Sequence, residues 1–541
     1  MAKQQVAQKY IFKISTARLR RAKWNLTLTL AEARQNDEII SIGDSQMLRW
    51  IDELNGVTGA EEKVRAIRSE IRSLRKRDIT PLIRKRIREL YAQLDAIQFK
   101  SDYLHLVCEN SSDFKRACNG FSVNGIKYVR LVGTSGGVKL STVVFVNEKL
   151  APELRKRIDN GRKMDIPFVP AKLEAYRALT CSGSTPVSTP KGILVVPDCV
   201  THFKEDVLYL TDENDGDPEL RLWKDFDVEL TESDGYGLML PELAERWSEE
   251  LKLGYVAGAV NTRASFEKGV VFTFDFREFA EKVAGTTIVK DAWGHEVDTN
   301  SVELILTTSQ LKLWSSYDSI EDYLRCCEEN HYTFGVTKVA PEHLEDRRTT
   351  NYQFLAPLAL SGEDIDELIA PTIDEVRDVI SGDYRKALVF MAGANLDDMD
   401  ALRQPDFVRA MMAEPRMFDD PFIKQKIKRA IAKRIDDAKI GVLSVHGNYS
   451  ILCGDPYALC QSIFGLEVTG LLKAGEIFNK YWADSGAEKV VVLRAPMSTR
   501  ENMIRRSVAR REDTDHWYQY IKTCTLFNAW DNGVSALNGA D

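Results

Sequence analysis

Residues 262–270 read TRASFEKGV, and residues 302–314 read VELILTTSQLKLW. Both stretches contain a short apolar run bounded by turn-forming residues, which is typical of β-strands. Each also carries a lysine: Lys268 precedes Gly269, and Lys312 follows the second run. A lysine that extends from a strand end into solvent is the ordinary explanation for either residue alone. As a pair on two strands, they are candidates for neutralising a phosphate group.

The rest of the chain alternates between strand-rich and helix-rich regions. Short apolar runs bounded by Gly, Pro, Asn or Asp continue through residues 106–350, and helical patterns interrupt them at 241–250 and 320–329. Residues 361–438 are helical and strongly charged, and residues 440–541 return to strands. This pattern predicts an α+β fold, and 541 residues suffice for three or four domains.

Residues 58–105 have a different character. Apolar positions recur at helical spacing on both sides of Pro81, which predicts two helices broken near Asp78–Pro81. Residues 63–88 contain eleven basic side chains against two acidic ones. A solvated face of a helical hairpin and an arm that contacts nucleic-acid phosphates explain this stripe equally well. The candidate nucleic-acid-binding residues are Arg75, Lys76, Arg84 and Lys85.

Composition excludes several classes of protein. The net charge of -8 argues against a uniformly basic nucleic-acid coat, although positive charge can still line an internal channel. The nine cysteines form no CxxC pair, so neither a disulfide scaffold nor a zinc knuckle is expected. No signal peptide or uninterrupted run of eighteen apolar residues occurs. We therefore expect reduced thiols, a cytoplasmic location and no membrane partner.

A series of segments follows in a fixed order over residues 169–541, beginning with VPAKLEAYRALTCSGST at 169–185 and TESDGYGLMLPELA at 231–244. Residues 262–270 and 302–314 come next. The later segments are TNYQFLAPL at 350–358, GNYSILCGDPYALCQ and GLLKAGEIF within 447–478, VVVLRAPMSTREN at 490–502, and the final SALNGAD. In this order they resemble the motifs of the RNA-silencing type of RNA-dependent RNA polymerase and of its phage-encoded single-chain relatives. The large cellular RNA polymerase subunit shows similar motifs near its metal site.

The resemblance implies a fold and an activity. The fold would be α+β, with two interleaved double-psi β-barrels that exchange strands, helical insertions, and an N-terminal helical and β region. The activity would be transcription: synthesis of RNA from NTPs on a DNA or RNA template with Mg²⁺, by a phage-encoded enzyme in the host cytoplasm. The predicted regions are a mixed N-terminal region (1–57), a basic helical hairpin (58–105), a β-rich linker domain (106–189), a first barrel (190–350), a helical insertion (351–440) and a second barrel (441–541).

The resemblance also assigns site residues one position at a time. Arg263 and Lys268 match the arginine and lysine of a glycine-lysine strand, and Lys312 matches the lysine of the next motif. Arg494 matches the arginine that lies near the sugar of the incoming nucleotide in the cellular enzyme. Asp541 matches the first carboxylate of the aspartate triad, which binds Mg²⁺. The chain departs from the family at three places: Gln310 replaces a methionine, Asn351-Tyr-Gln replaces LNRQ, and Ser-Thr-Arg replaces the Leu-His pair after Pro496.

The last residues raise an expectation of their own. The family continues beyond the position of Asp541 with Xaa-Asp-Gly-Asp, and a single carboxylate cannot hold two metal ions. We therefore expect a fragment or the product of a split gene, inactive alone, with a C-terminal segment that supplies the other aspartates. The alternative is a non-catalytic scaffold subunit that binds nucleic acid, or the inactive half of a split polymerase.

Overall fold

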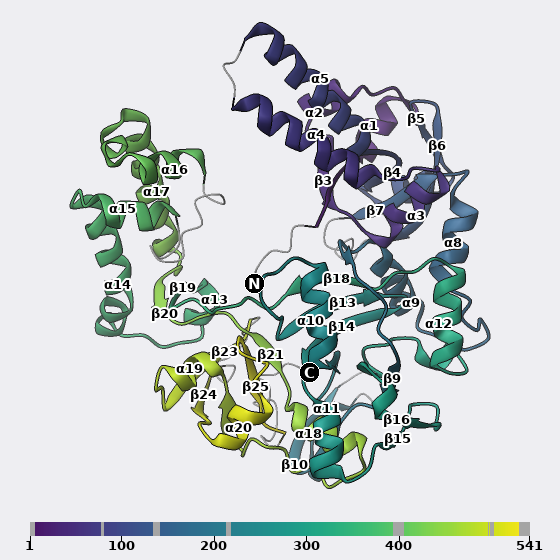
Figure 1. Ribbon diagram of the computed structural model, residues 1–541, viewed down its shortest axis with the longest axis vertical. Helices are drawn as coiled ribbons and strands as arrows, with labels where there is room; N and C mark the ends of the chain where they lie inside the picture. Colours follow the sequence, from purple (N-terminus) through teal and green to yellow (C-terminus); the bar gives the residue numbers. More distant parts are fainter. Residues whose placement is uncertain are drawn as a thin grey trace. The chain divides into compact units, whose positions relative to one another are not determined.

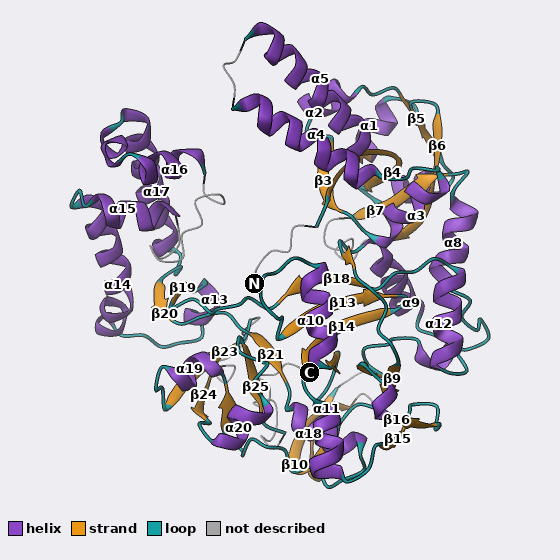
Figure 2. Ribbon diagram, in the orientation of Figure 1, coloured by secondary structure: helices purple, strands orange, loops and turns teal. Residues whose placement is uncertain are grey.

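The structure is a computed structural model that describes residues 6–76, 80–133, 141–211, 218–392, 405–495, 497 and 503–529. It contains helices and mixed sheets throughout, which confirms the predicted α+β class (Figure 1; Figure 2). The chain divides into two compact units. The first unit comprises Met1–Glu342, Cys453–Leu471 and Arg511–Cys524, and the second comprises His343–Leu452, Leu472–Arg510 and Thr525–Asp541.

The first unit begins with a seven-stranded sheet whose strand order is β2-β5-β6-β7-β4-β1-β3. Its first strand, β1 (Gln8–Ser15), pairs in parallel with β4 (Phe99–Val107) and antiparallel with β3 (Ile39–Gly43). Alternate side chains point to opposite faces, so each face has its own buried cluster. The other strands are β2 (Asn25–Leu26), β5 (Phe121–Val123), β6 (Ile126–Gly133) and β7 (Thr142–Asn147).

A helical hairpin lies in the chain between β3 and β4. It consists of α4 (Ala60–Arg75) and α5 (Pro81–Gln98), which confirms the two predicted helices. Pro81 occupies the first turn of α5, where no backbone donor is lost, and the Thr80 hydroxyl accepts a hydrogen bond from the Ile83 backbone N–H (3.3 Å). The helices pack through a small apolar seam of Ile71, Leu90, Leu94, Val64, Ile67 and Leu74.

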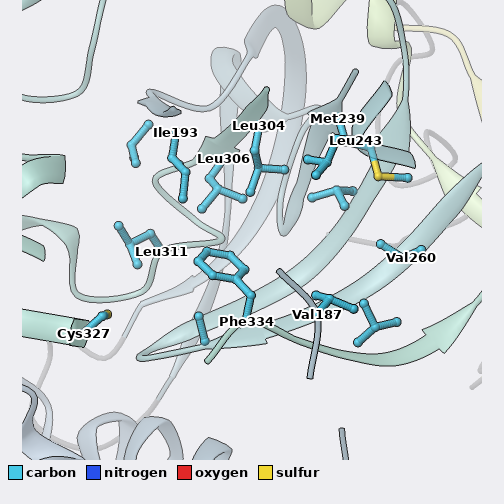
Figure 3. Packing of buried hydrophobic residues seen from close by; sticks show 14 of the residues in the cluster. Val187, Ile193, Met239, Leu243, Val260, Leu304, Leu306, Leu311, Cys327 and Phe334 are labelled. Atoms are coloured by element: carbon cyan, nitrogen blue, oxygen red, sulfur yellow. The ribbon is translucent and has the colours of Figure 1, made fainter. Parts of the chain in front are cut away.

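A second seven-stranded sheet, curled around its own core, forms the centre of the first unit. Its strand order is β8-β18-β13-β14-β12-β17-β9. Figure 3 shows the core, in which Val260, Leu304, Leu306 and Phe334 are buried together. Helices α10 (Pro241–Glu250) and α12 (Ile320–Glu329) cover it, with the bounds that the sequence predicts. The strands are β8 (Thr185–Pro186), β9 (Ile193–Val196), β12 (Tyr236–Met239), β13 (Ala259–Ala264), β14 (Glu267–Thr273), β17 (Leu304–Thr307) and β18 (Gly335–Val339).

The second unit contains a five-stranded sheet and a helical bundle. The sheet order is β21-β25-β22-β24-β23, from β21 (Ile451–Cys453), β22 (Glu476–Phe478), β23 (Lys489–Leu493), β24 (Met503–Val508) and β25 (Cys524–Phe527). Helices α14 (Gly362–Ile380), α15 (Tyr384–Ala392), α16 (Asp406–Ala413) and α17 (Pro421–Lys439) enclose a separate apolar cluster. Within the described ranges, no helix is long and apolar enough to cross a membrane.

Gly237 shows how closely two strands of the central sheet approach each other. A Cβ atom at this position would lie 2.1 Å from the Ile305 carbonyl oxygen, so alanine would force the backbone apart. We expect Gly237→Ala to lower the free energy of unfolding by about 1–3 kcal/mol. Gly362→Ala is the control, because no atom lies within 4 Å of its added Cβ. Equal denaturant midpoints for the two variants would contradict this packing.

Candidate functional site

A tight turn between β13 and β14 brings two predicted site residues together. Arg263 and Lys268 are directly opposite each other in the antiparallel register, so their side chains share one face of the sheet. The last pair of the ladder is Ala264 with Glu267, so Ser265 and Phe266 alone form the turn. Phe266 has a positive φ of 53° and is 2% exposed, so its buried ring holds the turn in a backbone conformation unusual for a bulky residue.

The third cation reaches this turn from the segment after β17. The Lys268 backbone N–H donates to the Gln310 carbonyl oxygen (3.1 Å), and the Lys312 N–H donates to the Phe266 carbonyl oxygen (3.0 Å). These two bonds fasten residues 310–312 alongside the turn. The structure therefore brings together Arg263, Lys268 and Lys312, which we call the basic cluster.

The charges of the basic cluster act on one another. The pKa of Lys268 is lowered, first by partial burial and then by the nearby charges of Arg263 and Lys312, while Asp234 opposes the shift. Burial also lowers the pKa of Arg263, against the attraction of Glu267. Within the described part of the chain, none of the three cations forms an ion pair with a carboxylate within 4 Å. Like charges that gather without a carboxylate in direct contact favour the binding of an anion.

Two buried polar side chains, Glu267 and Gln310, support the basic cluster from inside the sheet. The Glu267 carboxyl is fully buried and accepts hydrogen bonds from the Thr262 hydroxyl (2.6 Å) and the Gln310 amide (2.9 Å). Burial raises the pKa of Glu267. A Cβ atom at Gly269 would lie 2.6 Å from Gln310 Cγ, so the glycine after Lys268 makes room for this side chain. Sequence reasoning noticed Gln310 only as a replaced methionine and missed Glu267.

Asp198 holds two loops beside the cluster, and no local sequence pattern marks it as a site residue. One of its oxygens accepts from the Thr308 hydroxyl (2.7 Å) and the Ser309 backbone N–H (2.9 Å). The other accepts from the Ser233 hydroxyl (3.2 Å). The Ser309 hydroxyl oxygen in turn accepts a hydrogen bond from the Gly235 backbone N–H (2.8 Å). These bonds fix the loop that carries Asp234, the exposed carboxylate whose charge reaches Lys268.

The remaining predicted residues lie elsewhere. Arg494 follows β23 in the second unit and is partly buried, and Asp541 lies outside the described residues. In the part of the chain that the structure describes, no group of three or more His, Cys, Asp or Glu side chains could hold a metal ion.

The four predicted nucleic-acid-binding residues are all exposed on the helical hairpin. Arg75 and Lys76 end α4, and Arg84 and Lys85 lie in the first half of α5. Arg75 donates to the Tyr91 hydroxyl (3.0 Å), which leaves its other guanidinium donors available to solvent. The hairpin therefore presents a basic surface, as predicted.

Comparison with known proteins identifies the family. The model of the RNA dependent RNA polymerase family matches residues 73–507, and the chain belongs to this family. This confirms the resemblance inferred from the ordered segments.

Two relatives are informative. The DNA-directed RNA polymerase YonO of Bacillus phage SPbeta is 27% identical over 414 residues, which cover 74% of this chain and 46% of YonO. The structure is similar to the RNA dependent RNA polymerase QDE-1 from Thielavia terrestris, with a TM-score of 0.50 and 14% identity over 80% of this chain and 47% of QDE-1. The likeness to QDE-1 concerns the fold. The chain spans about half the length of both relatives.

Proposed function

We propose that this chain contributes the nucleotide-binding part of an RNA polymerase that copies a nucleic-acid template. The observation that carries this proposal is the basic cluster, three cations without carboxylate partners within the described residues, placed on segments that match the family. Family membership and the phage relative support the activity. The template would be DNA or RNA, and the substrates would be NTPs.

The basic cluster suits the charge changes of nucleotidyl transfer. The 3′-hydroxyl of the growing RNA attacks the α-phosphorus of the NTP, and the bond to the leaving pyrophosphate breaks. Negative charge on the leaving oxygens increases as the transition state forms. Lys268 and Lys312 would lie against the triphosphate and stabilise that charge, and Arg263 would raise the local positive potential. Because backbone hydrogen bonds hold all three residues, little reorganisation is needed.

Mg²⁺ remains part of the proposal on the basis of sequence alone. When bound, a pair of divalent ions would activate the hydroxyl and stabilise pyrophosphate. Asp541 is the candidate ligand, and it lies outside the described residues. The described side chains do not form a metal site, so no step is assigned through the ion.

We also propose that the central seven-stranded sheet of the first unit and the five-stranded sheet of the second unit are double-psi barrels that exchange strands, and that the gene belongs to a phage. The family likeness supports the first proposal and YonO the second. Residues 351–440 would then be a helical insertion, as α14 to α17 suggest.

Arg494 offers a test of both activity and site. We expect Arg494→Ala in the full-length gene product to reduce discrimination against deoxynucleotides by roughly tenfold to a hundredfold, the effect of losing a hydrogen bond from a charged group to the 2′-hydroxyl. Single-turnover addition with matched NTP and dNTP, on DNA and on RNA templates, measures this change and identifies the template. Template-complementary RNA from the unaltered protein is the expected result. Nucleic-acid binding without any incorporation would instead favour the scaffold alternative.

A further inference from the structure

A long two-stranded ribbon in the first unit carries an exposed apolar face. It consists of β10 (Val200–Thr211) and β11 (Glu219–Thr231), which form a sheet of their own. Leu208 lies opposite Leu222, and Leu210 lies opposite Leu220. Because side chains alternate along a strand, all four leucines point to one side, and we call them the leucine face.

All four side chains of the leucine face are more than half exposed to solvent. Leu208, Leu210, Leu220 and Leu222 are 63%, 70%, 65% and 52% exposed. Single exposed leucines are common on protein surfaces, whereas a contiguous group of four usually marks a contact surface. On the opposite face the Trp223 ring centroid lies 5.8 Å from that of Tyr209 and 4.8 Å from that of Phe226, and Trp223 is itself 53% exposed. The ring contact between Trp223 and Tyr209 links the two strands.

Negative charge borders the leucine face. The described residues 200–211 and 218–231 contain six carboxylate side chains against three cationic ones. The carboxylates on the two strands are all exposed: Glu205, Asp206, Glu219, Asp225, Asp227 and Glu229. The ribbon thus combines an apolar centre with an acidic border.

The apolar centre and acidic border of the ribbon together indicate which kind of molecule can bind there. Nucleic acid and anionic membranes would be repelled by the acidic border, and so would the same ribbon on a second copy of the chain. A protein surface with an apolar groove and a border of lysines or arginines complements both features. We propose that the leucine face is a docking surface for such a basic protein, distinct from the site that binds nucleotides.

Docking would place the four leucines at the centre of the interface. Buried apolar centres carry most of the binding energy of protein interfaces, and charged borders mainly steer association and set the partner. Binding through the ribbon should therefore depend on the leucines for affinity and weaken with added salt.

A pair of synthetic peptides tests the proposal on the full chain. One peptide carries leucines on one face and lysines on the other, and its twin has glutamate in place of lysine. By titration calorimetry, we expect the lysine peptide to bind and the glutamate twin not to bind. Binding of the lysine peptide to the Leu208→Ser/Leu222→Ser variant should be at least about tenfold weaker. Asp225→Lys/Asp227→Lys should also weaken it and reduce its salt dependence.

The matched control replaces two residues of similar exposure in the second unit. Ile380 and Ile440 are 64% and 63% exposed, and Ile380→Ser/Ile440→Ser should bind like the unaltered chain. All replaced side chains are exposed, and circular dichroism checks that each variant is folded. Equal binding by the leucine variant and the control, or no binding by the unaltered chain, would overturn the proposal. Self-association that Leu208→Ser/Leu222→Ser abolishes would also overturn it and assign the face to a second copy.

Discussion

In the complete enzyme, replacing Lys268 or Lys312 by alanine should lower the rate of single-turnover nucleotide addition by roughly 100- to 1000-fold, with template affinity almost unchanged. Both lysines belong to a cluster without carboxylate partners among the described residues, so their charge is available to the triphosphate. The charge they would neutralise grows in the transition state, which makes their contribution larger there than in the bound ground state. Template binding is spread over many phosphate contacts, and the loss of one cation affects it little.

Quench-flow measurement at saturating NTP separates an effect on the rate of nucleotide addition from an effect on template binding. Lys290→Ala is the control, because Lys290 is an exposed lysine of the same unit on a different two-stranded sheet. Variants that weaken template binding but add nucleotides at the normal rate would show that the cluster contacts the template instead.

Neutralising Arg75, Lys76, Arg84 and Lys85 together should weaken nonspecific nucleic-acid binding strongly at low salt. Each phosphate contact adds about 0.9 to the slope of log affinity against log salt on duplex DNA, so four contacts account for up to about 3.6. All four side chains are exposed on one helical hairpin, where they can reach a phosphate backbone.

Fluorescence anisotropy with labelled duplex at several salt concentrations measures the slope. The control variant replaces four exposed basic residues scattered over the same unit: Arg21, Lys23, Lys252 and Lys290. If the hairpin variant keeps the slope of the unaltered chain, the basic stripe is a solvated surface and nothing more.

Local patterns predicted much of the secondary structure. Helices α10 and α12 have the predicted bounds because Pro241 and Ser319 mark their first turns and apolar residues recur at helical spacing. The pairing of β1 with β4 was not predictable in this way. It joins residues about 90 positions apart, and register between distant strands depends on packing that no local pattern reports.

The candidate site was also predictable only where its residues lie in one short segment of the sequence. Lys268 and Arg263 were found because both lie in one short segment that matches a family motif. Glu267 looks in the sequence like any surface carboxylate beside a lysine, and only the structure shows it buried against Gln310. Asp198 was missed for a similar reason, since its partners lie 35 to 111 residues away along the chain.

The central claim is that the basic cluster binds the triphosphate of an incoming nucleotide, and equilibrium titration tests it most directly. The full chain is titrated with an NTP and with the corresponding nucleoside, which lacks phosphates. For Lys268→Ala/Lys312→Ala, NTP affinity should fall at least about tenfold, as expected for the loss of charge-assisted hydrogen bonds, while nucleoside affinity stays the same. Unchanged NTP affinity in this double variant would contradict the account.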